Sequence, residues 1–349
     1  MRIAQVAPLS ESVPPKQYGG TERIVSYLTE ELVRQGHDVT LFASGDSVTR
    51  ARLVAPCRRS LRRSDGCIDR MAHHVLMLEQ VSQRAHEFDV VHYHIDYLHF
   101  PLSRRALIPH VTTLHGRLDI PDLVPLYEQF RDMPVLSISN AQRKPLPWVN
   151  WQATIYHGLP EDLFRFRPKP GSYLAFLGRI SPEKRVDRAI EIAKRAGIPL
   201  KVAAKVDPVD KDYFERAVEP LLRSAVVEYV GEISDEEKDQ FLGNAYALLF
   251  PIDWPEPFGL VMIEAMACGT PVIAYDGGAV SEVIEEGRTG FIVKEVEGAT
   301  EAVRRVPELS RVRCREVFEK RFTAARMASN YLQVYERVIH RCSEHALKE

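Results

Sequence analysis

Residues 254–278 read WPEPFGLVMIEAMACGTPVIAYDGG and contain, in order, a loop, a helix and a strand. The Pro-Phe-Gly segment at 257–259 has the composition of a turn. The apolar run 260–268 predicts a short, mostly buried helix that a glycine ends. Residues 271–274 and 247–250, on either side, predict buried strands. Strand, loop, helix and strand in this order build a parallel sheet.

The amino-terminal part repeats this order of elements. Residues 2–7 predict a strand, 10–20 a loop rich in glycine and proline, 21–36 an amphipathic helix and 39–43 a second strand. Further strands are predicted at 90–94, 111–114, 135–138 and 153–156, with a helix at 68–86. After the proline-rich stretch 164–171 the pattern restarts, with strands at 173–177, 200–204 and 226–230, and helices at 184–196 and 235–244.

Two successive stretches of this kind predict an α/β protein of two doubly wound, Rossmann-like domains that face each other across a cleft. We expect the first domain at residues 1–165 and the second at 166–322, followed by an amphipathic helix at 322–345. Because open parallel sheets bind ligands at the carboxyl ends of their strands, the loops after strands are where functional residues are expected.

The composition excludes several classes of protein. The chain has 349 residues and a net charge of -2, whereas a chain-wide nucleic-acid binder is strongly basic. The five cysteines are scattered, which predicts neither a disulfide framework nor a zinc site and favours a cytoplasmic protein. Neither a leader peptide nor a membrane-spanning run is apparent in the sequence, so we expect any membrane contact to be peripheral.

Two carboxylates in the first quoted stretch are candidate ligand-binding groups. Glu256 precedes the predicted helix and Glu264 lies about two turns inside it. The free N–H groups at a helix start suit a diphosphate, and carboxylates accept hydrogen bonds from sugar and ribose hydroxyls. Taken alone, Glu256 reads more readily as a solvated loop acid. Glu264 has apolar neighbours, so it needs a partner for its charge.

Two cations follow another predicted strand, in the segment LGRISPEK. Arg179 and Lys184 at the start of a helix would neutralise the charge that develops on a departing diphosphate, although a solvated charge pair fits the same pattern. The strand at 200–204 continues into Lys205, which is a further candidate contact to the donor phosphate or sugar.

Candidate residues in the first half also follow strands. Gly19 and Gly20 let the backbone approach a ligand closely. His115 ends a strand before a glycine, and its alternative interpretation is a structural histidine. His94 and Asp96, at the end of another strand, are candidates for the side of the cleft that would bind a second substrate, the acceptor.

Together these motifs resemble the family-4 retaining glycosyltransferases of the GT-B fold (glycosyl transferases group 1), whose E-x7-E signature matches the spacing of Glu256 and Glu264. The resemblance implies that Glu256 contacts the donor sugar and Glu264 the ribose, and that the backbone of Phe258, Gly259, Leu260 and Val261 binds the sugar and phosphates. It implies that Arg179 and Lys184 hold the diphosphate, that the Gly19-Gly20 loop reaches the donor phosphate, and that His115 contacts the donor sugar. Glu256, His115, Arg179 and Lys184 are thus the expected catalytic residues.

The resemblance also implies a nucleotide-diphosphate sugar as donor, a UDP-hexose first and GDP-mannose second, and transfer with retention. It implies no cofactor and no metal, and a last helix, at 323–349, that packs back on the first domain. One departure from the family is the AAK sequence ending at Lys205, where many relatives have a glycine-rich turn.

Other interpretations stay open. Another enzyme of the same fold, such as a nucleotide-sugar 2-epimerase or a phosphorylase, and a non-catalytic nucleotide-sugar binder share these motifs. The arginine-rich segment 50–63 reads as an exposed loop, or as a docking site for a membrane surface or an anionic acceptor. The pair Asp210 and Asp212 has the spacing of a metal-binding loop but lies in a polar run that predicts a solvated segment.

Overall fold

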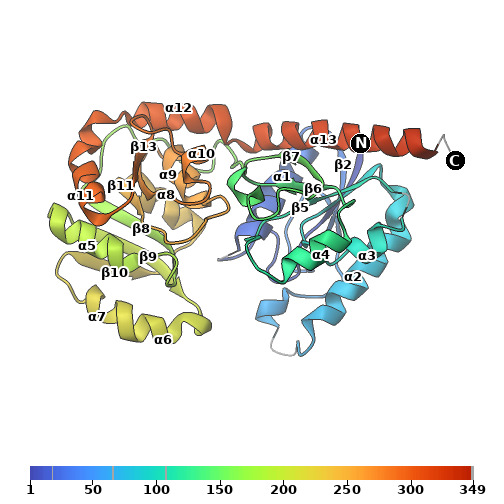
Figure 1. Cartoon of the computed structure of the whole chain (residues 1–349), viewed down its shortest axis with the longest axis horizontal. Coiled ribbons are helices and arrows are strands. Elements are labelled where there is room, and N and C mark those ends of the chain that lie inside the picture. The colour runs from blue at the N-terminus through green and yellow to red at the C-terminus, as the bar shows by residue number, and fades with distance from the viewer. Residues whose placement is uncertain (18, 65–66, 107, 347–349) are drawn as a thin grey trace. The chain divides into compact units, whose positions relative to one another are not determined.

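The computed structural model describes residues 1–349 except 18, 65–66, 107 and 347–349, and it divides the chain into two units (Figure 1). The first unit holds residues 1–158 and 324–349, and the second holds residues 159–323. The second unit is therefore an insertion into the first. The proline-rich stretch 164–171 lies within the second unit, where Arg167 forms an ion pair with Asp239 at 2.6 Å.

The first unit has a parallel sheet of seven strands among its described residues, in the order β3-β2-β1-β4-β5-β6-β7. The strands are β1 (Arg2–Val6), β2 (Asp38–Phe42), β3 (Arg52–Val54), β4 (Val90–Tyr93), β5 (His110–Thr113), β6 (Val135–Ser137) and β7 (Trp151–Thr154). The helices are α1 (Gly20–Arg34), α2 (Arg70–Arg84), α3 (Phe100–Ser103), α4 (Leu123–Gln129) and α13 (Ala324–Ala346).

The alternation of side chains along β1 and β4 gives each face of this sheet its own covering helices. Ala4, Val6 and Val91 belong to one cluster with Met77 and Val81 of α2. The opposite face carries polar side chains and is covered by α13, which packs beside α1 and against β5 (Figure 1). The last helix thus completes the core of the first unit.

The second unit has a parallel sheet of six strands within its described residues, in the order β10-β9-β8-β11-β12-β13. The strands are β8 (Tyr173–Ile180), β9 (Leu200–Val206), β10 (Val227–Gly231), β11 (Ala245–Phe250), β12 (Val272–Tyr275) and β13 (Gly290–Val293). The helices are α5 (Val186–Ala196), α6 (Lys211–Tyr213), α7 (Glu219–Leu222), α8 (Asp235–Gly243), α9 (Leu260–Ala267), α10 (Val280–Val283), α11 (Val296–Arg305) and α12 (Arg311–Arg321). Helix α5 packs with α11, and α9 packs with α8 and α12.

The arginine-rich segment 50–63 is not simply a loop, because it contains the edge strand β3, whose residues pair with Thr40, Leu41 and Phe42 of β2. In the described part of the chain, every helix is too short or too polar to cross a membrane.

Candidate active site

The candidate residues of the second unit lie where the strand order of its sheet reverses. Strands β8 and β11 are neighbours in the middle of the sheet, and the chain leaves them toward opposite edges. Such a reversal opens a crevice at the carboxyl ends of the strands, which is where open α/β sheets bind ligands. Arg179 lies near the end of β8, and Glu256 follows β11.

One carboxylate oxygen of Glu256 accepts two hydrogen bonds. The ammonium of Lys184 and the indole Nε1 of Trp254, at 3.1 Å, both meet Glu256 Oε2. The same ammonium lies 5.6 Å from the ring centre of Phe250 and 5.1 Å from that of Trp254. The Glu256 side chain is buried, so the solvated-acid interpretation is wrong, and the two charges stabilise each other in a site of reduced polarity.

The loop after β12 holds the backbone at Glu256 in place. Ala279 N donates to Glu256 O at 2.9 Å. Gly278 has a φ of +55°, and a Cβ added there would lie 2.1 Å from Glu256 O and 2.3 Å from Glu256 N. Only glycine allows this approach, so the Gly-Gly turn fixes where the Glu256 carboxylate stands.

Helix α9 begins beside this carboxylate. Gly259 precedes it with a φ of +83°, where a Cβ would lie 2.7 Å from Met262 and 3.0 Å from Phe250. Phe258 is buried and makes an edge contact with Phe322, with ring centres 6.2 Å apart. The packing of Phe258 on Phe322 therefore holds the turn in place. The first N–H groups of the helix, including those of Leu260 and Val261, have no acceptor within the helix itself.

Glu264 has the partner that its burial requires. Its side chain is 6% exposed, and Lys238 of α8 approaches its Oε1 at 3.4 Å while also contacting Asp235 at 3.1 Å. The sequence pattern did not single out Lys238, because it lies on a different helix.

Arg179 lies among carboxylates. It contacts Glu183 at 2.7 Å, Asp210 at 3.4 Å and Asp207 at 3.6 Å. Arg179 and Lys205 are register partners on β8 and β9, and Lys205 Nζ also contacts Asp207, at 3.0 Å. Two cations thus stand side by side at the carboxyl end of the sheet, partly neutralised by acids.

The segment around Asp210 is largely exposed, as the sequence predicted, but Asp210 itself is buried beside Arg179, and burial raises the pKa of its carboxyl group. The joint role expected of Arg179 and Lys184 stays a prediction. Lys184 pairs with Glu256, and the register partner of Arg179 on the next strand is Lys205.

In the first unit the glycine loop leads directly into a helix. Gly19 is the residue before α1 and Gly20 is its first residue. A Cβ at Gly19 would lie 2.8 Å from Pro15, so the loop is closely packed there.

His94 and His115, which were expected to play separate roles, lie together. His94 Nδ1 is 2.9 Å from His115 Nε2, and His94 Nε2 is 2.8 Å from Gln5 Oε1. Both ring nitrogens of His94 are engaged inside the unit, so a direct contact to an acceptor, as expected from the sequence, is closed to this side chain. His157, which was not singled out in the sequence, stacks on His115 with ring centres 5.3 Å apart.

Burial lowers the pKa of His115 to about 3 and lowers the pKa of His94 well below the usual range, so both rings are neutral at pH 7. Asp96 has exposed surface, but desolvation of its carboxyl group raises its pKa to about 6, against the opposing effect of a hydrogen bond from the His115 backbone. Asp96 therefore lies beside His115 with its carboxyl group only partly hydrated.

Two family models match the chain. The model for glycosyltransferase family 4 matches residues 18–178, and the model for glycosyl transferases group 1 matches residues 163–321. The alpha-maltose-1-phosphate synthase of Mycolicibacterium smegmatis is 25% identical over 343 residues, covering 85% of this chain and 86% of that protein. The chain belongs to the family-4 glycosyltransferases of the GT-B fold.

Solved structures agree on the fold of this glycosyltransferase. Sucrose-phosphate synthase from Thermosynechococcus elongatus matches with a TM-score of 0.80 and 19% identity, over 98% of this chain and 100% of that one. Anabaena Alr3699/HepE in complex with UDP-glucose matches with a TM-score of 0.72 and 18% identity, over 97% and 99%. The two family models and the maltose-1-phosphate synthase relative identify the protein as an enzyme that transfers sugars.

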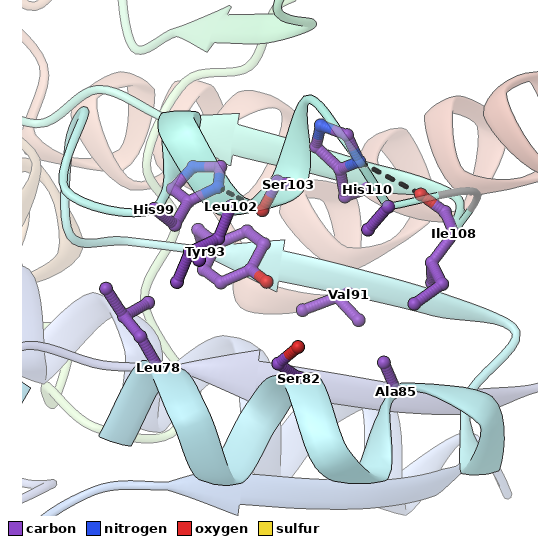
Figure 2. Close-up of a pocket in the computed structure, with 11 residues that line it drawn as sticks. Leu78, Ser82, Ala85, Val91, Tyr93, His99, Leu102, Ser103, Ile108 and His110 are labelled. Atoms are coloured by element: carbon purple, nitrogen blue, oxygen red, sulfur yellow. Dashed lines mark hydrogen bonds between the residues drawn. The ribbon is translucent and has the colours of Figure 1, made fainter. Parts of the chain in front are cut away.

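A small pocket of the glycosyltransferase lies on the other side of the first sheet, between α2, α3 and β4 (Figure 2). The rings of Tyr93 and His99 stack with their centres 3.6 Å apart. The His99 ring is hydrogen-bonded through Nδ1 to Ser103 Oγ at 2.7 Å and through Nε2 to Thr112 Oγ1 at 2.6 Å. The predicted site residues do not line it, so we assign it no part in sugar transfer.

The arginine-rich segment of the glycosyltransferase uses much of its charge internally. Arg50 pairs with Glu30 at 2.7 Å and Arg52 with Glu87 at 2.8 Å, while Arg62 pairs with Glu11 at 2.8 Å. Arg58 and Arg59 are exposed, and the side chain of Arg63 lies outside the described residues. These pairs leave less charge for a membrane or an anionic acceptor than the sequence alone indicates.

Proposed function

We propose that this glycosyltransferase moves a hexosyl group from a nucleotide-diphosphate sugar to an acceptor hydroxyl, with retention of configuration and without a metal ion. A UDP-hexose is the first choice of donor and GDP-mannose the second. The crystallised complex of Anabaena Alr3699/HepE with UDP-glucose supports the first choice.

The observation that carries this proposal is the arrangement around Glu256. A carboxylate, an ammonium and an indole N–H meet at one point beside the start of helix α9, at the reversal of the sheet. A sugar diphosphate has the complementary groups, because its hydroxyls donate to a carboxylate and its phosphates accept from cations and N–H groups.

Each residue has a distinct part in the proposed reaction. Glu256 accepts a hydrogen bond from a hydroxyl group of the donor sugar, and Glu264 accepts one from a hydroxyl group of the ribose. Lys184 and Arg179, with Lys205, take the diphosphate. Gly259 and the next N–H groups of α9 add backbone donors. Because these groups are fixed before the ligand arrives, little reorganisation is needed as charge develops.

The proposed chemical step breaks the bond between the anomeric carbon and the diphosphate oxygen and forms a bond from the same face to the acceptor oxygen. The acceptor proton passes to the departing phosphate oxygen. Arg179 and Lys184 stabilise the negative charge that the diphosphate gains. No protein nucleophile takes part, so a covalent sugar adduct on Glu256 would contradict this step.

The first test is a thermal-unfolding screen with UDP, GDP, ADP and their common sugar conjugates, with and without EDTA. A ligand that binds the native state raises Tm by mass action. We expect stabilisation by UDP and UDP-sugars that EDTA leaves unchanged. A shift that EDTA abolishes would contradict metal independence, and a lack of response to every nucleotide would contradict the proposed donor site.

The second test separates transfer from mere binding. Glu256→Gln should bind UDP but lose turnover, whereas Glu228→Gln, at an exposed carboxylate of β10, should keep both. NMR of the product would show whether the anomeric configuration is retained. Binding of donor with no turnover toward any acceptor, or toward water, would favour a nucleotide-sugar binding module.

A further inference from the structure

Seven side chains of the first unit, six of them buried and His115 partly buried, form one continuous hydrogen-bonded chain, called here the histidine–tyrosine network. Its members are Gln5 of β1, His92 and His94 at β4, Thr113 and His115 at β5, and Tyr331 and Tyr335 of α13. It connects His115, which the family resemblance implies to contact the donor sugar, with helix α13 at the far end of the sequence.

The fold places these side chains on one face of the sheet. Gln5 and His92 are register partners, and His94 stands two residues beyond His92 and therefore points to the same side. Thr113 and His115 are likewise two residues apart. Tyr331 and Tyr335 are one helical turn apart, and their hydroxyl groups reach this face from α13.

The position of each proton in the network follows from Gln5. Its amide nitrogen donates to Tyr335 Oη at 3.1 Å, and its carbonyl Oε1 lies 2.8 Å from His94 Nε2. A carbonyl oxygen only accepts, so His94 Nε2 carries the proton. Because burial keeps His94 neutral, its Nδ1 is bare and accepts from His115 Nε2 at 2.9 Å.

The remaining ring nitrogen of His115, Nδ1, carries no proton. The ring is neutral and its proton is on Nε2, so Nδ1 carries a lone pair. This atom is buried and has no hydrogen-bond partner in the part of the chain that the structure describes. A buried acceptor without a partner is costly, and a ligand hydroxyl group would satisfy it.

The other branch of the network keeps the same direction. Tyr335 accepts from Gln5 and donates to His92 Nδ1 at 2.7 Å, so His92 Nε2 donates to Thr113 Oγ1 at 2.8 Å. Thr113 then donates to Tyr331 Oη at 3.0 Å. Each bond fixes the next, and reversing the Gln5 amide would reverse the whole series.

We propose that the histidine–tyrosine network fixes His115 as the Nε2–H tautomer, so that its Nδ1 accepts a hydrogen bond from a hydroxyl group of the bound sugar. Gln5, His94 and Tyr335 are then positioning residues that act through His115. The identity of the ligand rests on the proposed function, whereas the tautomer does not.

The tautomer can be measured without any ligand. In the full-length protein labelled with 15N-histidine, two-bond proton–nitrogen correlation spectra at pH 7 distinguish the two tautomers, and comparison with His115→Gln assigns the His115 signals. We expect a protonated Nε2 and a bare Nδ1. A protonated Nδ1 on His115 would overturn the proposal, because the network would then run in the opposite direction.

The positioning role is tested by Tyr335→Phe, with Tyr93→Phe as the control. Tyr93 is another buried tyrosine of the first unit but lies on the opposite face of the sheet, outside the network. In Tyr335→Phe we expect His115 to show a mixture of tautomers and kcat/KM for UDP-glucose to fall about three- to tenfold. Tyr93→Phe should change neither. A single unchanged tautomer in a folded Tyr335→Phe protein would show that Tyr335 does not set it. Should Tyr335→Phe fail to fold, Gln5→Glu serves instead, because a carboxylate cannot donate to Tyr335.

The contact to the sugar is tested with UDP-glucose analogues that carry fluorine in place of one hydroxyl at a time. Fluorine cannot donate, so one analogue should lose about tenfold in kcat/KM with the native enzyme and much less with His115→Ala. Equal losses in both proteins for every analogue would exclude the contact. If no UDP-sugar is turned over while the expected tautomer is found, the proposed donor fails and the network assignment stands.

Discussion

Lys184 and Glu256 form an ion pair across 72 residues of sequence, at the ends of two neighbouring strands of one sheet. Each residue belongs to a separate motif, and the pairing makes the two motifs one structural unit. It also implies that a ligand finds both charges already oriented.

Breaking this pair from one side should cost stability as well as activity. Lys184→Met leaves a buried carboxylate without its cation, and we expect a loss of about 2 kcal/mol in unfolding free energy, less than for a fully buried pair because both side chains are slightly exposed. The double variant Lys184→Met/Glu256→Gln should recover most of this loss yet stay inactive, with kcat/KM down at least about 100-fold.

Chemical unfolding and steady-state kinetics measure both effects. Lys201→Met is a suitable control, since Lys201 pairs with the exposed Glu228 and should matter by less than about 1 kcal/mol. Recovery of activity along with stability in the double variant would contradict a role of this pair in the reaction.

Gly278 should be irreplaceable for a steric reason. In Gly278→Ala the new methyl group would meet the backbone of Glu256 at 2.1 Å and displace its carboxylate, so kcat/KM should fall about 100-fold. Gly197→Ala is a matched control, because Gly197 also has a positive φ, +67°, but has open space around it. It should cost about 1 kcal/mol of stability and leave turnover unchanged. Similar kinetics for the two variants would contradict the proposal that Gly278 holds the Glu256 backbone in place.

Mild acid should destabilise the first unit selectively. All twelve histidines of the sequence lie outside residues 159–323, and burial lowers the pKa of His92, His94, His99, His110, His115 and His157. Below pH 6.5 these rings are protonated in the unfolded chain but stay neutral in the folded protein. Stability is thus complete above that pH and falls as pH drops from 6.5 toward about 3 for His115, by about 1.4 kcal/mol per pH unit for each such ring.

Hydrogen exchange at pH 7.5 and 5.5, corrected for intrinsic rates, would locate this loss. Peptides from β4 and β5 should lose protection at the lower pH, while those from β8 and β11 serve as the internal reference. Equal loss in both units would show that the histidines are not its source.

Asp207 should weaken the binding of the nucleotide diphosphate. It lies 3.0 Å from Lys205 and 3.6 Å from Arg179, so its charge competes with the phosphates. Asp207→Asn should tighten UDP binding about fivefold, or about 1 kcal/mol, at low salt, and the gain should shrink at high salt. Calorimetric titration against Glu228→Gln would measure this effect. Weaker binding in Asp207→Asn would mean that Asp207 positions the cations instead.

The sequence predicted the elements whose patterns are local. The apolar runs and glycine stops marked most strands to within a few residues, and they also marked α9 with its turn and the helices α1, α2, α5, α8 and α13. It did not predict β3, because this edge strand has only three residues and begins with Arg52, nor the short β13. The partners of the candidate side chains were the hardest to predict. Lys238, Asp207 and Tyr335 come close to the candidate residues only in the tertiary fold.

The position of α13 sets an order of events during synthesis. Residues 159–323 are contiguous and can fold as soon as they leave the ribosome, whereas the preceding 158 residues lack the helix that covers Gln5, His92 and Thr113. Until residues 324–346 emerge, we expect this polar face of the sheet to be solvated, so that the protons of its side chains exchange with water. We therefore expect the inserted unit to complete its fold before the first unit does.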